Sequence, residues 1–337
     1  HAPSPSGRDV QCTDKMISIK QAGPGDRNVW TDFVLRSNNG TIFHLPDFLD
    51  YHPEGRFRNH HLIAENSSGI VSVIPGALAE REDGTWFRSY PGASYGGPVF
   101  NDSLGLSKIE NTVDELCSYC RSSGFRGIEL TPPPIVYYRR PHNYLEFSLV
   151  KRNFKYMKRE LTAVIDLSRL GEELNLGFRS SAIRGVRKAE KNGVQVSENS
   201  DFALFYHVLE SNLQQRHGVK PTHTLEELEK LRNLLGRDRI RQFIAMKDGD
   251  VLAGMVMFHC NPRVTLAFYI SHDQEHQALR PVNSVYMEVI RWAKQMGYHY
   301  MDLGTFTLNM DVNYGLCRFK ESFSARGIFR NTLFGTV

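Results

Sequence analysis

A helix that ends at a glycine and continues into a short strand occurs twice in this sequence. Residues 115–130 align with residues 288–303 without a gap, and Gly124 falls on Gly297. In both copies the apolar residues before the glycine recur at helical spacing, and an apolar strand follows. Glycine readily ends a helix because it adopts left-handed backbone without strain. A duplicated β-β-α-β unit explains the match most simply; the alternative is a chance similarity between two amphipathic helices.

The length of the chain also favours two domains. At 337 residues it exceeds the size at which a single hydrophobic core usually stops growing. Hydrophobic residues make up 41% and charged residues 23%, which is ordinary for a chain that can bury a core. The sequence therefore predicts an α/β protein with two domains, residues 10–170 and 171–337.

The second domain has the clearer local signals. Apolar spacing predicts helices at 202–217, 225–235 and 282–296, and strands at 240–246, 251–259 and 264–271. In the first domain it predicts a helix at 106–123 and strands at 61–65, 69–78 and 85–90.

Charge and hydropathy narrow the class of protein. The formal net charge of +4 is too small to identify a nucleic-acid-binding protein, although a local cluster could still form a basic surface. No run approaches the ~18 apolar residues that a membrane-spanning helix requires. Residues 1–7 lack the apolar core of a signal peptide. We therefore expect a soluble, cytoplasmic protein with no transmembrane segment.

Cysteine usage agrees with a reducing compartment. The five cysteines are an odd number scattered from Cys12 to Cys317, which argues against a disulfide framework. Cys117 and Cys120 form a CxxC, but they lie within a predicted helix and have no second pair or histidine at zinc spacing. We interpret them as helix-packing residues and predict no metal site.

The segment 308–326 carries a resemblance to a known family. Gly315, Leu316, Phe319, Lys320 and Phe323 fit a Gly-Leu-x-x-Phe-Lys-x-x-Phe-Gly pattern, in which serine follows here instead of the final glycine. This pattern resembles the C-terminal signature of the FemAB family and of BioF-type acetyltransferase-like proteins. The resemblance implies two tandem GNAT-like domains, each a mixed, mainly antiparallel sheet flanked by helices, with the active site in the second.

The same resemblance implies a function. FemAB-like enzymes transfer an acyl or aminoacyl group to an amine in envelope biosynthesis, including peptidoglycan, or in metabolite biosynthesis. Such a reaction needs a deprotonated amine and positive charge where the tetrahedral oxyanion develops. Lys320 is the first candidate for that charge; the alternative is a surface lysine paired with Glu321 or Asp311. Tyr269 and Asp302 are further catalytic candidates, Asp302 as a general base, although Tyr269 could equally be a core residue.

Four residues are candidates for binding the substrate. Arg216 ends a predicted helix where the resemblance places an arginine beside the acceptor pocket, and a guanidinium there could hold a phosphate or carboxylate. The alternative is a solvated helix end. Phe319 belongs to the Phe-Lys pair that lines the family's substrate channel. Asn313 and Tyr314 come directly before the Gly-Leu of the signature.

A basic helix face is the candidate donor site. The cations at three- and four-residue spacing are Arg184, Arg187, Lys188 and Lys191. They could contact the phosphates of tRNA, or they could simply be solvated, since Glu190 interrupts them.

The loop before the helix at 282–296 is the second feature that concerns the donor. A GNAT enzyme that binds acetyl-CoA presents backbone N–H groups to the pyrophosphate at this place. Here no glycine allows close approach and Pro281 has no N–H, so an ordinary pyrophosphate cradle is impaired. Arg280 could still contribute charge to a differently built CoA site.

Three functional hypotheses follow. The first is a FemAB-type aminoacyltransferase that uses aminoacyl-tRNA as donor and a small-molecule or peptide amine as acceptor. The second is an acyl-CoA-dependent N-acetyltransferase with the same fold. The third is a non-catalytic binding or scaffold protein. In each case we expect no tightly bound cofactor, and no oligomeric state follows from the sequence.

Overall fold

The computed structural model describes residues 16–337 except 173, 175 and 176, and it leaves the side chains of residues 216 and 217 undescribed. Cys12 lies outside this range. The remaining four cysteines are free, and Cys120 is fully buried in the helix predicted for it. Within the described residues we find no helix that combines the length and the hydropathy needed to cross a membrane.

The first half of the chain is mainly β. Its helices are α1 (Arg27–Arg36), α2 (Pro46–Leu49), α3 (Leu106–Ser122) and α4 (Tyr144–Lys151). Its strands are β1 (Ser18–Gln21), β2 (Arg58–Asn59), β3 (Leu62–Asn66), β4 (Gly69–Ile74), β5 (Gly76–Arg81), β6 (Gly84–Ser89), β7 (Val99–Phe100), β8 (Gly127–Leu130) and β9 (Lys155–Asp166).

The second half contains longer helices and strands. Its helices are α5 (Ser180–Lys191), α6 (Phe202–His217), α7 (Leu225–Leu235), α8 (Pro281–Gln295) and α9 (Tyr314–Ser322). Its strands are β10 (Gln195–Glu198), β11 (Ile240–Lys247), β12 (Asp250–Asn261), β13 (Val264–His272), β14 (Tyr300–Thr305), β15 (Thr307–Leu308), β16 (Asp311–Val312) and β17 (Arg326–Thr336).

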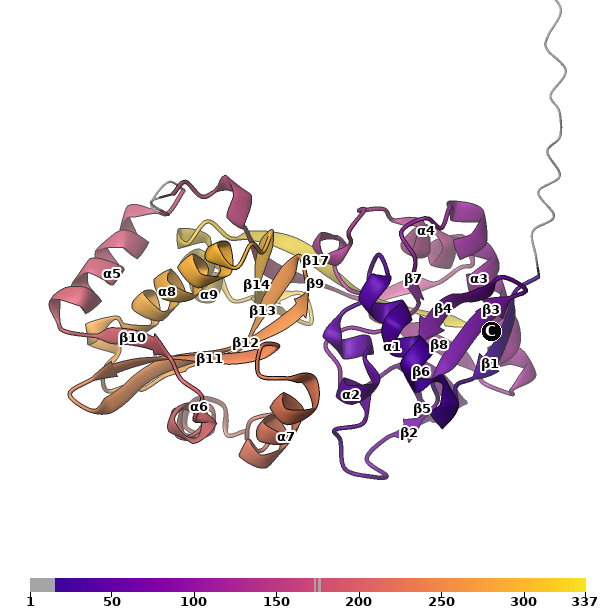
Figure 1. Cartoon of the computed structure of the whole chain (residues 1–337), viewed down its shortest axis with the longest axis horizontal. Coiled ribbons are helices and arrows are strands. Elements are labelled where there is room, and N and C mark those ends of the chain that lie inside the picture. Colours follow the sequence, from indigo (N-terminus) through magenta and orange to yellow (C-terminus); the bar gives the residue numbers. More distant parts are fainter. Residues whose placement is uncertain (1–15, 173, 175–176) are drawn as a thin grey trace, which may run out of the picture.

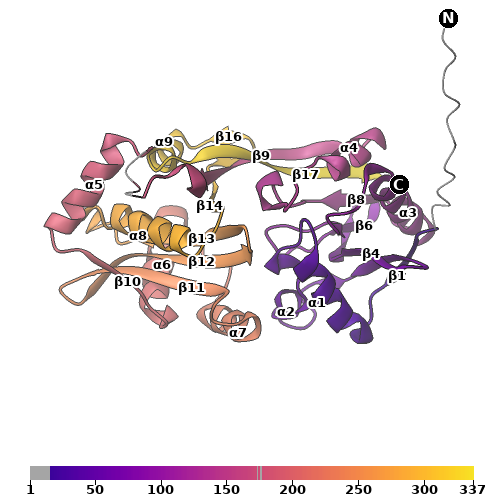
Figure 2. The same ribbon diagram turned by 45° about the horizontal axis from the view of Figure 1, so that its top comes forward.

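One eleven-stranded sheet runs through both halves, in the order β10-β11-β12-β13-β14-β9-β17-β8-β6-β5-β2. The long antiparallel strands β9 and β17 cross from one half to the other, as Figures 1 and 2 show. The last strand of the chain therefore pairs with β8 of the first half. The predicted domain boundary near residue 170 stays a prediction; β17, which follows it in the chain, pairs with β9 and with β8 of the first half.

The internal repeat corresponds to a repeated unit of structure. In the first half, α3 connects the parallel strands β6 and β8; in the second, α8 connects the parallel strands β13 and β14. Gly124 and Gly297 follow the two helices with φ of +77° and +80°, so both occupy the left-handed region that favours glycine. The structure confirms the predicted mixed, mainly antiparallel α/β fold.

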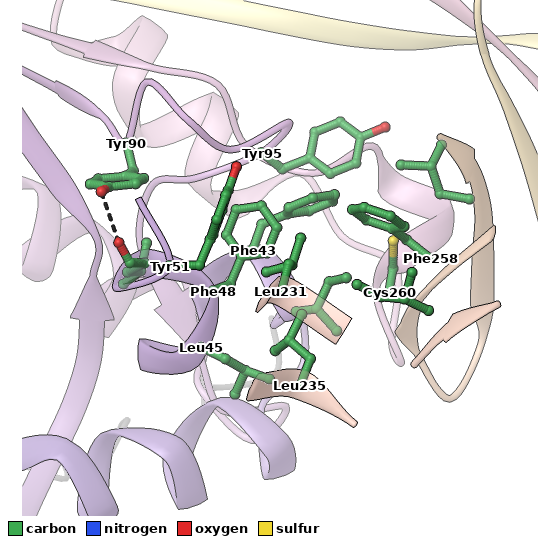
Figure 3. Packing of buried hydrophobic residues seen from close by; sticks show 14 of the residues in the cluster. Phe43, Leu45, Phe48, Tyr51, Tyr90, Tyr95, Leu231, Leu235, Phe258 and Cys260 are labelled. Atoms are coloured by element: carbon green, nitrogen blue, oxygen red, sulfur yellow. Dashed lines mark hydrogen bonds between the residues drawn. The ribbon is translucent and has the colours of Figure 1, made fainter. Parts of the chain in front are cut away.

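The two halves share a hydrophobic core. Helices α6 and α7 pack on one face of the second half's sheet and continue into the core of the first half. Figure 3 shows Phe43 and Tyr95 of the first half packed near Leu231 and Phe258 of the second. Helices α5 and α8 cover the opposite face of the sheet. This shared core and the crossing strands hold the two halves in one position.

The predicted continuous strand at 69–78 is wrong in one respect. The chain breaks at Pro75 into β4, which joins the four-stranded sheet β1-β3-β4-β7, and β5, which joins the large sheet. Proline has no N–H to donate to a ladder, which favours a break at this position. Gly76 then lies against Phe87, where a side chain would meet the ring at 2.3 Å.

Candidate active site

A cleft of about 820 Å³ opens where β13 and β14 separate. These parallel strands pair only from Val264 to Leu266 and from Tyr300 to Asp302. Beyond that point their residues line the cleft, together with residues from α8 and α9. The first half contributes Ser94 and Tyr95. A separation of paired strands creates a pocket but leaves backbone groups without ladder partners, which must be satisfied in another way.

Lys320 of α9 satisfies the freed backbone of β14. Its Nζ donates to the carbonyl oxygens of Leu303 at 2.7 Å, Gly304 at 2.9 Å and Thr305 at 3.0 Å. Lys320 is 3% exposed and lines the cleft, so it is not a surface lysine, and Glu321 pairs instead with Arg179. Burial lowers the pKa of Lys320 to about 8, against the attraction of nearby Asp302. Because three N–H groups serve three carbonyls, the ammonium acts on the cleft through its charge.

Asp302 lies beneath the cleft and is fully buried. Its Oδ2 accepts hydrogen bonds from the hydroxyls of Tyr95 at 3.0 Å and Tyr137 at 2.8 Å. Its Oδ1 accepts from the Thr162 hydroxyl and from the N–H of Gly304. Asp302 is not among the described residues that line the cleft, and its oxygens already hold four donors. The position indicates that it fixes the strand end which carries the three carbonyls.

Tyr269 lines the cleft from β13, and its hydroxyl is bonded to His223. The phenolic oxygen lies 2.7 Å from Nδ1 of His223 and accepts from the backbone N–H of the same residue at 3.1 Å. Burial raises the pKa of Tyr269 to about 12 and lowers that of His223 to about 4. The pair is therefore neutral at physiological pH, and it attaches the segment before α7 to the wall of the cleft.

Two of the four predicted substrate-binding residues line the cleft. Phe319 and Asn313 line the cleft, and Asn313 caps α9 by accepting from the N–H of Leu316 at 3.0 Å. Tyr314 is 66% exposed and is not among the described residues of the cleft wall. Arg216 lies in α6, but its side chain is outside the described part of the structure.

A smaller basic pocket of about 470 Å³ adjoins the cleft between α5, α8 and α9. Arg184 and Lys188 of α5 line it, together with Arg280 and Arg318. Arg280 also lines the cleft, as do Asn283 and Phe319, so the two spaces meet there. Arg187 and Lys191 are exposed on α5 outside this pocket. Four of the five predicted donor-binding residues therefore lie on α5, and three of the five line one pocket.

The entrance to α8 has the backbone expected from its sequence. Arg280 caps the helix with φ of +62°, and Pro281 is its first residue. Because proline supplies no N–H, this helix terminus depends more on the side chain of Arg280 for holding an anion.

The charged residues that line the cleft and the basic pocket are lysines and arginines. The cleft is lined by Lys320, Arg280 and Arg330, and no Asp or Glu occurs among the described residues of its wall. The described residues that line the basic pocket likewise include no Asp or Glu. The site can therefore stabilise anionic groups, while the part of its wall that the structure describes offers no carboxylate as general base.

Sequence reasoning missed Arg330, the cation that β17 brings to the cleft. Its guanidinium donates to the carbonyl of Ser94 at 2.8 Å and lies 5.1 Å from the ring centre of Tyr95. The residues are 236 positions apart in the chain, and only the crossing of β17 into the first half joins them. No local pattern around Arg330 in the sequence indicated that it would meet Ser94 and Tyr95.

The sequence of the second half and the fold of the whole chain are similar to those of known proteins. Residues 177–321 match the family model of the acetyltransferase (GNAT) domain. The solved structure of FemX covers 95% of this chain and 97% of its own, with a TM-score of 0.72 and 13% identity. The C-terminal domain of a putative lysylphosphatidylglycerol synthetase from Agrobacterium fabrum covers 92% and 91%, with a TM-score of 0.60 and 11% identity.

A tandem GNAT protein from the clavulanic acid biosynthesis pathway is also similar, with a TM-score of 0.53, 8% identity and coverage of 95% and 98%. At these identities the solved structures show the fold. No curated protein sequence matches the chain. The second half of the chain thus matches the model of a GNAT domain, and the whole-chain likeness shows a fold of two tandem GNAT-like halves.

Proposed function

We propose that this acyltransferase takes an aminoacyl group from aminoacyl-tRNA and transfers it to the amine of a cell-envelope or metabolite acceptor. The observation that supports the proposal is the continuity between the basic pocket and the cleft at Arg280, Asn283 and Phe319. A donor whose phosphates lie against α5 would extend its acyl end into the cleft. The likeness of the whole chain to FemX favours aminoacyl transfer.

The chemistry would proceed without a carboxylate base. The acceptor amine attacks the ester carbonyl of the donor, and the charge of Lys320 stabilises the oxyanion of the tetrahedral intermediate. The amine proton passes to solvent or to the leaving 3′-oxygen, and collapse of the intermediate gives an amide and the free tRNA hydroxyl. Arg280 and Arg330 would hold anionic groups of the two substrates.

A second candidate is N-acetyl transfer from acetyl-CoA, because the matching family model describes an acetyltransferase domain. Arg280 and Pro281 argue against it, since an N–H-rich cradle for pyrophosphate is replaced there by a left-handed arginine and a proline. Side-chain cations on α5 suit the spaced phosphates of a nucleic acid better than they suit one compact pyrophosphate.

Binding of fluorescently labelled tRNA, measured by anisotropy, tests the donor. Substituting Arg184→Gln and Lys188→Gln should weaken tRNA binding by roughly tenfold or more and reduce its dependence on salt. Arg169→Gln is the matched control, because Arg169 is exposed and pairs with Asp166 on another segment. If the protein binds acetyl-CoA and does not bind tRNA, the acetyltransferase alternative is selected. Binding of neither donor would support the scaffold hypothesis.

A further inference from the structure

The cleft has two sides that different parts of the chain build. On one side, Arg280, Asn283 and Phe319 join it to the basic pocket, whose described lining residues all belong to the second half. On the other side, Ser94 and Tyr95 of the first half line it. In Figure 1, α5 of the basic pocket lies at the edge of the second half that faces away from the first half. A donor that enters from α5 therefore leaves the side next to the first half for the acceptor.

Arg330 brings a positive charge to this second side of the cleft. Its guanidinium donates to the carbonyl oxygen of Ser94 at 2.8 Å and lies 5.1 Å from the ring centre of Tyr95. Tyr95 is in turn fixed by its hydrogen bond to the buried carboxylate of Asp302 at 3.0 Å. The first half therefore orients the guanidinium independently of any substrate. A side chain that is already ordered loses less conformational entropy when it binds a ligand, which favours affinity.

Most of the hydrogen-bonding capacity of Arg330 is unused. A guanidinium has five N–H donors, and the hydrogen bond printed for this one among the described residues goes to Ser94. Glu160 of β9 lies directly opposite in the ladder, but its carboxylate accepts from the backbone N–H of Met310 at 3.3 Å. Glu160 is also not among the described residues of the cleft wall. The guanidinium therefore offers free donors and an unbalanced charge to the cleft.

The surroundings of Arg330 favour a carboxylate over a phosphate. Two N–H groups of a guanidinium match the two oxygens of a carboxylate, whereas a phosphate dianion gains more from several cations or from the N–H groups of a helix terminus. The residues that line the cleft from the first half, Ser94 and Tyr95, are uncharged. Of the other cations in the described wall, Lys320 donates to three carbonyls and Arg280 lies beside the basic pocket.

We infer that Arg330 binds a carboxylate of the acceptor, so that the acceptor is an amine that also carries a carboxylate, as amino acids and peptide ends do. The inference rests on the proposed function, because it gives the acceptor the side of the cleft that the donor leaves free. Arg330 selects the acceptor and orients it, whereas the charge of Lys320 acts on the oxyanion. Loss of the Arg330 side chain should therefore raise the KM for the acceptor more than it lowers kcat.

Calorimetric titration of the full chain with ω-amino acids tests the inference without a donor. The series runs from glycine to aminohexanoate, which varies the spacing between amine and carboxylate, and each acid is compared with its amide. At least one acid should bind wild type roughly tenfold or more tightly than its amide. Arg330→Gln should abolish this preference. Arg330→Lys should keep only part of it, because lysine retains the charge but not the planar fork of donors.

Arg326→Gln is the matched control. Arg326 is an exposed arginine of the same strand that also donates to a backbone carbonyl, that of Ala325 at 2.8 Å, and it is not among the described residues of the cleft wall. This control should keep the wild-type preference for the acid. Equal binding of every acid and its amide by wild type would overturn the inference, and so would an undiminished preference in folded Arg330→Gln or in Arg330→Lys.

Two further results separate this inference from its alternatives. Phosphoethanolamine that binds more tightly than every acid, and loses this advantage in Arg330→Gln, would assign the residue to a phosphate and overturn the inference. Because the titration contains no donor, its outcome is independent of tRNA binding: failure of the tRNA assay refutes the proposed donor, whereas failure of the acid to outbind its amide refutes the class of acceptor.

Discussion

Substitution of Lys320 by methionine tests the role of the buried ammonium. The change keeps the length of the side chain but removes the charge and the three hydrogen bonds to the carbonyls of residues 303–305. Loss of one electrostatic contact to a developing oxyanion typically lowers kcat by about 100- to 1000-fold. We expect a loss of this size in the transfer of radiolabelled amino acid from charged tRNA to an amine acceptor.

Stability should change much less than activity in this variant. A pKa lowered from 10.5 to about 8 means that the fold disfavours the charged form of Lys320 by roughly 3 kcal/mol. The uncharged methionine does not carry this cost. Three carbonyls left without their donor cost about 1 kcal/mol each, which offsets the gain. Denaturant unfolding should therefore show a free energy of unfolding within about 2 kcal/mol of that of wild type.

Lys294→Met is the matched control. Lys294 of α8 also donates to backbone carbonyls, those of Leu170 and Gly171, but it is not among the described residues of the cleft. The control should transfer at the wild-type rate. Full activity of Lys320→Met, or an equal loss in the control, would refute the assignment of Lys320 to the chemistry.

The remaining predictions concern pH and three neighbouring positions. The pKa of Lys320 is lower in the folded protein than in the unfolded chain, so between about pH 8 and 10.5 the unfolded chain binds more protons than the folded protein. The stability of wild type relative to Lys320→Met should therefore rise with pH across this window, as measured by denaturant unfolding at each pH. Transfer by wild type should decline as pH rises through about 8. Asp302→Asn should destabilise the fold by about 2–4 kcal/mol because hydroxyl donors then face an NH₂ group, and an unchanged midpoint in urea would contradict the network. Tyr269→Phe should lower stability by about 1–2 kcal/mol and kcat by less than roughly tenfold; a much larger kinetic loss would assign the hydroxyl to catalysis. Gly185→Ala should lower Tm, since a Cβ would lie 2.4 Å from Nδ2 of Asn283, and an unshifted melt would show that α5 and α8 pack more loosely than described.

The elements that sequence patterns predicted best are those whose local signals agree with their packing. Helix α8 begins with proline and is followed by Gly297, its apolar residues recur at helical spacing, and the structure buries that face on the sheet. The repeat with α3 follows from the same signals. The prediction of one strand at 69–78 was wrong because apolar residues stand on both sides of Pro75, while the structure ends β4 at Ile74 and begins β5 at Gly76.

The site was only partly predictable, for a physical reason. The Phe-Lys motif located Lys320, but a motif cannot state that β13 and β14 separate after three residue pairs and free three carbonyls for the lysine to bind. Asp302 was selected as a base because it lies at a strand end; its burial beneath Tyr95 and Tyr137 depends on contacts across the two halves. Arg330 reaches the cleft through the crossing of β17, which no local pattern specifies.

The central claim, that the basic pocket and the cleft together use an aminoacyl-tRNA donor, is tested most directly by supplying both donors at once. The protein would be mixed with an amine acceptor, charged tRNA and acetyl-CoA, and the acceptor analysed by mass spectrometry. The account predicts an acceptor that has gained an aminoacyl group, and no such product from Lys320→Met. An acceptor that has gained only an acetyl group would contradict it.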